Sequence, residues 1–531
     1  MENNINILEK NFEEHGCDWI SELPDSLLLH ILSFLHMEDV LRTSFLSRRW
    51  RYVWTSITTM DFNFGPSHER ILRPIEYSTT FIDKSTSLHI GVRYFRVHFD
   101  SLELDHYPPQ VSSWIHFAVD HNVEELDLAF AGEGNTFVEV EDYDERKLTP
   151  FMFNCRSLRT LSLTYVALDP PTSTSFSSLK TLYLARIILS ANKIKNLTSN
   201  CPLLEDIIVK DCSSAQNLDI FVENRQLHCL TVMDSDLYHF YDDHDYDDLY
   251  IAFGNGFDDM GYMTTKIEIY APNLLSLKLI GNKPQREYRI KNLQSLVEAS
   301  IDYEEELYNG CHECYEHNIN SLKGLLEDLR HVKDLKLCSW CIQLLSLREL
   351  QCVDALSMNS TRLDLMIGLS KWELPGIAHL LKSCCSLETL IQHLDKKPLL
   401  EIHNYRSQQR LNWEDKYDFD ERVYWKSQKL CFYKLFEHLK TVIIYDLSSY
   451  PTPVNGYEPT PTDVKVKSVI DEPENEINFV KFLLSNSTVM EKMDISILEE
   501  VCSQPEFLLN LTERLLAFPR ASPKAEIHVS Y

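Results

Sequence analysis

The stretch CRSLRTLSLTYVALDPPTSTSFSSLKTLYLARIIL, residues 155–189, contains the apolar spacing L-x-x-L-x-L twice. The two copies place leucine at equivalent positions: Leu158, Leu161 and Leu163, then Leu179, Leu182 and Leu184. Neighbouring residues of a β-strand point to opposite faces, so each copy gives a short strand one apolar face. The pattern therefore predicts short strands whose inward positions are leucine, joined by segments that return the chain for the next strand.

Further copies follow and define a period. Successive starts at Leu158, Leu179, Leu204 and Leu227 lie 21, 25 and 23 residues apart. The strand centres are expected at residues 161–163, 182–184, 207–209, 230–232, 277–279 and 335–337. This spacing and period are typical of leucine-rich repeats, whose strands stack into one parallel sheet. We therefore predict an α/β fold, a curved leucine-rich-repeat solenoid, rather than amphipathic strands scattered over an unrelated α/β domain.

The C-terminal part of the chain alternates strand and helix patterns. Strands are expected in HLKTVII (438–444), VMEKMDISI (489–497) and AEIHVSY (525–531), and helices in INFVKFLLSN (477–486) and FLLNLTERLLAF (507–518). An uncapped last repeat would leave an apolar face in water. We expect this segment to extend the sheet of the solenoid and to cap it.

Composition narrows the classes of partner and compartment. The 531 residues include 51 basic and 80 acidic side chains, a formal net charge of −29. This balance argues against a nucleic-acid or anionic-membrane surface, which needs clusters of lysine and arginine. No secretory signal or membrane-length apolar run is visible, so the 14 cysteines are expected to be reduced thiols in the nucleus or cytoplasm.

The N-terminal stretch ISELPDSLLLHILSFL, residues 20–35, carries more apolar surface than a small module can bury. One helical face is defined by the spacing i, i+3, i+4 and i+7: Leu28, Ile31, Leu32 and Leu35. Leu27 and Phe34 lie off that stripe, so the helix is apolar more than halfway round. The following residues 37–54 predict two more short helices, and three short helices form a very small core. A partner, or the repeat domain, is expected to cover the second face.

At this point the residues match a known family. The N-terminal segment resembles the plant form of the F-box, through Leu23-Pro24, Ile31-Leu32, Leu35, Asp39, Ser44, Arg49-Trp50 and Trp54. The segments FVKFLLSNSTVMEKMDI (479–495) and LLAFPRASPKAEIHV (515–529) resemble the FBD domain. The chain as a whole is similar to plant F-box/FBD/leucine-rich-repeat proteins. This resemblance implies five segments: an N-terminal tail (1–16), an F-box (17–56), the solenoid (57–402), an acidic linker (403–423) and an FBD-like domain (424–531).

The resemblance also implies a function without chemistry. Proteins of this family are substrate-recognition subunits of SCF-type ubiquitin ligases, in which the F-box binds a Skp-family adaptor and, through it, a cullin. The repeats hold a target protein, whose identity the sequence does not encode. Carried over by position, the adaptor interface or its immediate support consists of Leu23, Pro24, Leu28, Ile31, Leu32, Leu35, Val40 and Trp50. Which of these touch the adaptor and which fill the F-box core is left open by the sequence.

Two other functions compete with this one. Some similar plant proteins use the repeat concavity to bind a small hormone above an inositol phosphate, which requires a basic floor on the inner strands. The strand positions here show few basic residues, and the net charge of −29 opposes a polyphosphate. The other alternative is a repeat scaffold whose F-box is out of use, but the Leu23-Pro24 and Ile31-Leu32 pairs are both intact.

Two features invite a metal hypothesis. The pairs Cys311-x-x-Cys314 and Cys338-x-x-Cys341 have the spacing of a four-thiolate zinc site. Cys338 follows Leu337 on a predicted repeat strand, however, where cysteine packs as a small hydrophobic residue. The aspartates of residues 238–250 lack the order of an EF-hand loop and indicate a solvated acidic insert. We therefore expect no metal, no cofactor and no catalytic residues.

Overall fold

The computed structural model describes most of the chain outside the long connections. The described residues are 20, 23–63, 82–86, 91–102, 110–132, 148, 150–172, 175–212, 218–222, 224–234, 266–281, 287–303, 312–351, 355–394, 424–425, 428, 432–447, 474–498 and 505–531. The predicted tail (1–16), acidic insert (238–250) and acidic linker (403–423) lie outside them. The chain divides into two compact units, Met1–Ile207 and Ile208–Tyr531.

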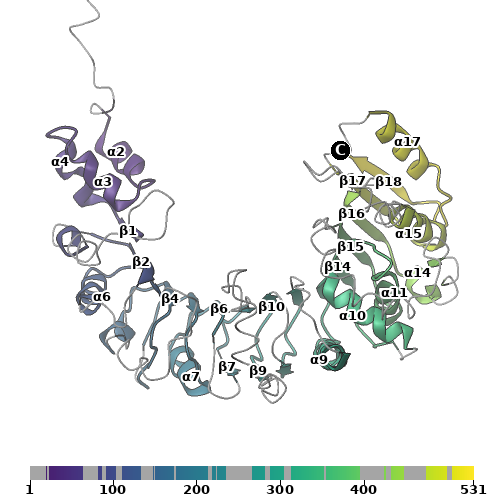
Figure 1. The fold of residues 1–531 in the computed structure, drawn as a ribbon, viewed down its shortest axis with the longest axis horizontal. Helices are drawn as coiled ribbons and strands as arrows, with labels where there is room; N and C mark the ends of the chain where they lie inside the picture. The colour runs from purple at the N-terminus through teal and green to yellow at the C-terminus, as the bar shows by residue number, and fades with distance from the viewer. Residues whose placement is uncertain are drawn as a thin grey trace, which may run out of the picture. The chain divides into compact units, whose positions relative to one another are not determined.

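The first unit begins with a helical module, by which we mean residues 23–57 (Figure 1). Its elements are α2 (Asp25–Leu32), α3 (Met37–Thr43), α4 (Trp50–Val53) and the 3-10 helix η1 (Trp54–Ser56). Parallel strands follow in chain order: β1 (Thr59–Asn63), β2 (Tyr94–Leu102), β3 (Glu125–Gly132), β4 (Thr160–Thr164), β5 (Thr181–Ala185) and, at the division, β6 (Asp206–Lys210). The returning segments include α6 (Val111–Asp120), η3 (Pro150–Asn154) and α7 (Ala191–Ser199).

The register of these strands follows from the leucine spacing. Leu161 of β4 pairs with Leu126 of β3 on one side and with Leu182 of β5 on the other. These leucines are buried, whereas the intervening Ser162 and Tyr183 are partly exposed on the opposite face of the sheet. One face of the sheet is therefore core, and the other, which we call the open sheet face, carries the polar side chains.

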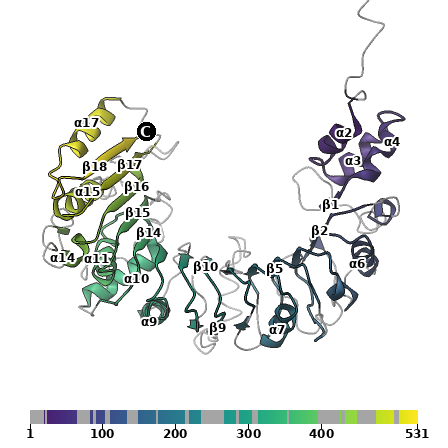
Figure 2. The same cartoon turned by 180° about the vertical axis from the view of Figure 1, so that it is seen from behind.

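The second unit continues with the same kind of sheet (Figure 2). Its parallel strands occur in the order β8 (Cys229–Asp234), β10 (Ser276–Gly281), β12 (Glu298–Tyr303), β13 (Asp334–Cys338), β14 (Arg362–Ile367), β15 (Thr389–Leu394), β16 (Thr441–Leu447), β17 (Lys492–Ile497) and β18 (Glu526–Ser530). All the predicted repeat strands lie in strands of the sheet, which confirms the leucine-rich-repeat fold. The three strands expected near the C-terminus are β16, β17 and β18, and they extend the sheet.

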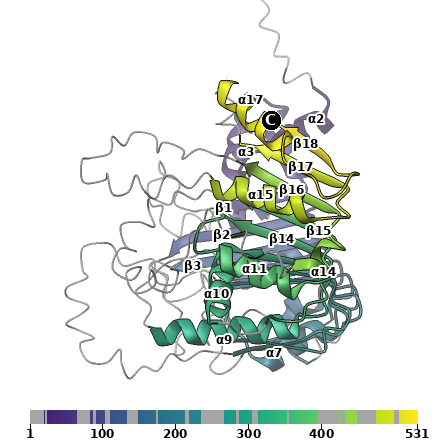
Figure 3. The ribbon, with the colours of Figure 1, turned by 90° about the vertical axis from the view of Figure 1, so that its right-hand side faces the viewer.

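The connections on the core side of the second unit are of two kinds. Some repeats return through a second, three-stranded parallel sheet: β11 (Glu287–Lys291), β9 (Lys266–Tyr270) and β7 (Leu218–Phe221). Others return through helices: α9 (His312–Asp328), α10 (Ser339–Leu350), α11 (Leu374–Ser383), α14 (Tyr433–Phe436), α15 (Glu474–Asn486) and α17 (Pro505–Leu516). Figure 3 shows α9, α10 and α11 stacked in chain order, and α10 contacts both of its neighbours. None of the helices in the described part of the chain combines the length and apolar character that a membrane span requires.

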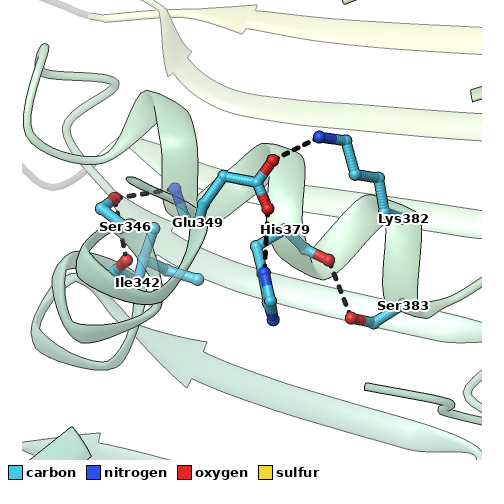
Figure 4. A network of polar contacts seen from close by, with 7 residues as sticks. Ile342, Ser346, Glu349, His379, Lys382 and Ser383 are labelled. Atoms are coloured by element: carbon cyan, nitrogen blue, oxygen red, sulfur yellow. Dashed lines mark hydrogen bonds and ion pairs between the residues drawn. The ribbon is translucent and has the colours of Figure 1, made fainter. Parts of the chain in front are cut away.

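The contact between α10 and α11 is the closest of these helix pairs. The backbone N–H of Gly376 donates to Ser346 Oγ at 2.7 Å, and Ser346 Oγ donates in turn to the carbonyl oxygen of Ile342 at 3.1 Å. Figure 4 shows Ser346 and Ile342 beside a second link between the helices, in which Glu349 accepts from both His379 and Lys382. A side chain at position 376 would collide with the carbonyl oxygen of Ile342. The helices can approach so closely because residue 376 has no Cβ.

Replacing this glycine should separate the two helices. Gly376→Ala is expected to lower the free energy of unfolding by about 1–3 kcal/mol, because over-packing a closed contact forces the backbone apart. Helix propensity alone would favour alanine by about 1 kcal/mol, so a loss identifies the steric contact as its cause. Urea unfolding of the full chain measures the change. Gly91→Ala is the matched control, since a Cβ there meets nothing within 4 Å; equal stabilities of the two variants would contradict the explanation.

Candidate functional site

The core of the helical module is small. Leu28 and Leu32 of α2, Val40 of α3 and Trp50 of α4 are each at most 3% exposed. Contacts run from α2 to α4 and η1, and from α3 to β1. Four of the eight predicted adaptor-binding residues thus form the interior of the module, and their role is to hold its surface in place.

An arginine joins the start of α2 to the start of α4. The guanidinium of Arg49 donates to the backbone carbonyl of Leu23 and forms an ion pair with Asp25 at 2.7 Å. Pro24 precedes the helix, and its carbonyl accepts the N–H groups of Leu27 and Leu28 at 2.9 and 3.1 Å. The Leu-Pro and Arg-Trp pairs of the sequence motif therefore meet in space, where Arg49 holds the start of α2 against the start of α4.

A group of apolar side chains on α2 and in the turn that follows it faces water. Leu27 is 48% exposed, Ile31 41%, Leu35 40% and Phe34 75%. Leu27 and Ile31 lie four residues apart on one side of α2, and Phe34 and Leu35 lie in the turn that follows the helix. Phe34 makes an edge-to-face contact with His30, with ring centroids 4.9 Å apart. Large apolar side chains grouped on so small a module are typical of a surface that another protein covers.

Three further residues of the module expose large side chains. Phe45 is 89% exposed and Leu46 is 69% exposed, both in the turn that follows α3. Tyr52 of α4 is also mostly exposed. We call Leu27, Ile31, Phe34, Leu35, Phe45, Leu46 and Tyr52 the exposed apolar set. Of the predicted residues, Ile31 and Leu35 belong to it, Pro24 is exposed and Leu23 is partly buried.

Sequence reasoning left most of the exposed apolar set out of the predicted site. Leu27 and Phe34 were visible as apolar residues off the main stripe, and their spacing with Ile31 marks a second face of the same helix. Phe45 and Leu46 stand directly after a short amphipathic helix, where an apolar pair has no core of its own to enter. No comparable signal distinguishes Tyr52 from the buried aromatic residues beside it.

The open sheet face of the first unit carries a charged ladder. Strand register aligns Asp61 of β1, Arg96 of β2, Asp127 of β3 and Ser162 of β4 in one row. Arg96 lies 3.2 Å from Asp61 and 3.0 Å from Asp127. His98 Nε2 lies 3.1 Å from the same Asp127 oxygen. The row is a preformed polar surface whose charges largely compensate one another.

The pKa values of Asp127 in the charged ladder and of the nearby Tyr94 on β2 are shifted from their ordinary values. Burial opposes ionisation of Asp127, but hydrogen bonds with His98 and Ser162 and the charge of Arg96 leave its pKa below the ordinary value. Burial, with nearby carboxylates, raises the pKa of Tyr94 to about 12. At neutral pH the ladder therefore presents an ionised aspartate and a neutral phenol.

The open sheet face of the second unit has an aromatic surface instead. His393 of β15 stacks on Tyr445 of β16, with ring centroids 4.7 Å apart and an interplanar angle of 15°. His393 Nε2 lies 3.2 Å from Asp364 Oδ1 of β14. Met366 occupies the next place in the row, paired with His393 by register. Tyr445 is 39% exposed, so part of its ring is open to a partner.

The paired cysteines are only partly within the described residues. Cys311 and the side chain of Cys314 lie outside them. Cys338 and Cys341 are buried, with their sulfur atoms 3.8 Å apart. Within the ranges that the structure describes, no group of three or more His, Cys, Asp or Glu side chains is placed to hold a metal ion.

Comparison with known proteins agrees with the arrangement of helical module and repeats. A family model of the F-box domain matches residues 20–59, and the model described as the At1g61320/AtMIF1 LRR domain matches residues 85–242. F-box/LRR-repeat protein 25 of Arabidopsis thaliana is 35% identical over 204 residues, covering 38% of this chain and 71% of that protein. The chain belongs to the plant F-box/LRR-repeat family.

Longer matches cover nearly the whole chain. The putative F-box/FBD/LRR-repeat protein At5g44950 of Arabidopsis thaliana is 26% identical over 503 residues, covering 92% of this chain and 95% of that protein. The putative F-box/LRR-repeat protein At5g02930 of the same plant is 26% identical over 427 residues, covering 77% of this chain and 80% of its own length. The helical module is therefore an F-box, and the sheet is the repeat array of this family.

The charged ladder makes the stability of the first unit depend on pH. Asp127→Asn should lower the free energy of unfolding at neutral pH by about 1.5–3 kcal/mol, the range for hydrogen bonds to a charged group. Because the folded-state pKa of Asp127 is depressed, its contribution is present at neutral pH and is lost as the pH falls through that pKa. The difference in free energy of unfolding between wild type and variant, measured by urea unfolding, should therefore become smaller as the pH is lowered.

A neighbouring exposed ion pair supplies the control for this measurement. Arg93 and Glu124 lie 2.8 Å apart, but the Arg93 side chain is mostly in water. Glu124→Gln should therefore change stability less than Asp127→Asn, since solvent screens an exposed pair. If the loss of stability caused by Asp127→Asn stayed constant from neutral to acid pH, the charge of Asp127 would not be its cause.

Proposed function

We propose that this protein is the substrate-recognition subunit of an SCF-type ubiquitin ligase. In this proposal the F-box binds a Skp-family adaptor and, through it, a cullin, while the repeats bind a target protein. The observation that carries the proposal is the exposed apolar set on a module too small to bury it. The family to which the chain belongs supports it, because F-box proteins typically have this role.

The energetics of the exposed apolar set suit a stable protein contact. Fully burying a leucine, isoleucine or phenylalanine side chain contributes roughly 1.5–3 kcal/mol. Ile31 and Leu35 are about half covered already, so each retains part of this energy for a partner, and Phe34 and Phe45 retain most of it. Several such side chains together supply enough energy to offset the entropy lost on association.

The role proposed for the chain itself is to position other proteins, not to catalyse a reaction. The adaptor would hold the receptor on the ligase, and the open sheet face would hold the target near the ubiquitin-loaded enzyme. The charged ladder and the stack of His393 on Tyr445 are the described features of that face best suited to contact a protein. We place the protein in the nucleus or cytoplasm, where such ligases act.

The adaptor contact is tested by placing negative charge at two residues of the exposed apolar set. Ile31→Asp combined with Leu35→Asp should weaken binding to Skp-family proteins about 100-fold or more, because each carboxylate would be buried without a partner. Deletion of residues 1–60 should abolish binding. Pull-down from a panel of purified Skp-family proteins, followed by Kd measurement for those that bind, gives the result.

The matched control places the same change on exposed leucines far from the F-box in sequence. Leu203→Asp combined with Leu275→Asp alters residues that are 45% and 42% exposed on the repeats, and adaptor binding should persist. Circular dichroism and thermal unfolding check that all variants remain folded. A folded wild-type chain that binds no member of a broad Skp panel would remove the adaptor role and leave that of a repeat scaffold.

The target contact is tested separately on the second unit. His393→Ala combined with Tyr445→Ala should remove the target while leaving adaptor binding unchanged, because tyrosines on exposed interfaces often dominate binding energy. Affinity mass spectrometry from plant cells with the proteasome inhibited compares the proteins captured by wild type and variant. The matched control is His116→Ala with Phe151→Ala, which removes another His–aromatic pair, tilted and with a centroid distance of 4.4 Å, from helical segments. If both variants captured the same proteins in equal amounts, the His393–Tyr445 surface would be excluded as the target contact.

A further inference from the structure

Two cysteines occupy the junction between β13 and α10. Cys338 is the last residue of β13 and the N-cap of α10, and Cys341 is the third residue of that helix. Their sulfur atoms lie 3.8 Å apart, within hydrogen-bonding distance for a thiol and a sulfur acceptor. A disulfide needs a sulfur separation of about 2 Å, so the two sulfurs are in contact and must approach further for a bond to form.

The surroundings of Cys338 favour its thiolate. The hydrogen bond with the Cys341 thiol, together with backbone N–H groups of Cys341 and Tyr303, lowers the pKa of Cys338 although burial opposes this. The N–H of Tyr303 lies 3.3 Å from the Cys338 sulfur. Cys338 also stands at the N-terminus of a twelve-residue helix, where the peptide dipoles stabilise negative charge.

Cys341 has the opposite character. Both cysteines are buried, Cys338 at 4% and Cys341 at 0% exposure, but for Cys341 burial raises the pKa of the thiol well above the ordinary value. The two thiols therefore differ in role. Cys338 is the more readily ionised and reacts first, whereas Cys341 stays protonated until it attacks the oxidised Cys338. Cysteine pairs with this spacing at a helix start are the arrangement in which thiol–disulfide chemistry is favoured.

We propose that Cys338 and Cys341 are a dithiol pair that a peroxide converts into an intramolecular disulfide. The pair would be a reversible oxidation site on the second unit, separate from the F-box surface and independent of the function proposed above. In a compartment that keeps thiols reduced, such a disulfide is transient and reports oxidising conditions.

The reaction balances with the peroxide as its only oxidant. The Cys338 thiolate attacks one peroxide oxygen, a sulfur–oxygen bond forms, the oxygen–oxygen bond breaks, and the departing hydroxide becomes water on taking a proton. Cys341 then attacks the sulfur of the resulting sulfenic acid, the sulfur–sulfur bond forms, and the second hydroxide leaves with the proton of Cys341 as water. Two thiols and one hydrogen peroxide give one disulfide and two waters, with two electrons passing from sulfur to oxygen.

Other described cysteines differ from this pair. Burial raises the pKa of Cys201 and of Cys384 to about 12. Cys201 donates its thiol to the carbonyl of Leu197 at 2.8 Å. Cys385 is exposed and follows Cys384 in the chain. These residues allow the selectivity of oxidation to be measured within a single molecule.

The test uses the full-length wild-type chain and hydrogen peroxide. After peroxide treatment and removal of excess reagent, free thiols are alkylated under denaturing conditions and the chain is digested with trypsin. Lys336 and Arg348 flank both cysteines, so they appear together in the peptide 337–348. We expect this peptide to become lighter by two hydrogens and to resist alkylation, and dithiothreitol should restore both alkylation sites. The Cys201 thiol should stay reduced at the same peroxide concentration.

Two variants separate the roles of the cysteines. Cys341→Ser should leave a sulfenic acid at Cys338 that dimedone captures, whereas Cys338→Ser should leave Cys341 reduced. If a variant fails to fold, the measurement on the wild-type chain still decides the proposal. The peptide 383–396, which contains exposed Cys385, confirms that the oxidant was active.

Three results would overturn the proposal. The peptide 337–348 could remain fully alkylated at peroxide concentrations that oxidise Cys385. Cys338 could advance to sulfinic acid without forming the link. Finally, the purified chain could carry stoichiometric zinc whose removal lowers its melting temperature, which would make these thiols ligands of a structural metal.

Discussion

Parallel pairing of short strands that can each bury only one face constrains the whole molecule. In β4 the residues Leu161 and Leu163 enter the core, and Ser162 between them must face the open side. Since each strand offers only two or three inward residues, no repeat is stable by itself, and its apolar face is covered by the returning segment and the neighbouring repeats. The same constraint leaves a polar surface along the sheet. Its residues can contact a partner without changing the packing of the core.

The F-box follows a different rule, because three short helices cannot enclose a comparable core. Trp50 and Leu28 fill the space between the helices, and Arg49 fixes the start of α2 against α4. What remains on the surface is apolar, including Phe34 and Phe45. The module is stable as part of a unit that also contains β1, yet its outward residues have the composition of an interface. Stability and docking thus depend on neighbouring residues of the same short segment.

The sequence was sufficient where one residue type repeats at a fixed spacing. Strands with leucine at the inward positions were predicted with correct residues, as were the C-terminal strands and helices. Strand β2 was missed because Phe95, Val97 and Phe99 take the inward positions in place of leucine. Strand β3 was missed although it has Leu126 and Leu128, because Val123 stands where the L-x-x-L-x-L pattern has its first leucine. The second sheet was missed because its strands bury only a pair of residues, such as Ile267 and Ile269, too few for a periodicity. Likewise, the stripe of α2 could not be divided into core and surface, because that division depends on how α2 packs against α4.

The open sheet face differs in character between the two units, and this difference bears on recognition. In the first unit Asp127 and Arg96 already satisfy one another, so a partner must compete with existing ion pairs and gains little net energy from them. In the second unit Tyr445 offers a partly exposed ring whose covering displaces water, and its stacking on His393 is already fixed. A partner of the second unit would therefore draw most of its affinity from the aromatic surface, whereas in the first unit the charged ladder would contribute mainly to orientation and selectivity.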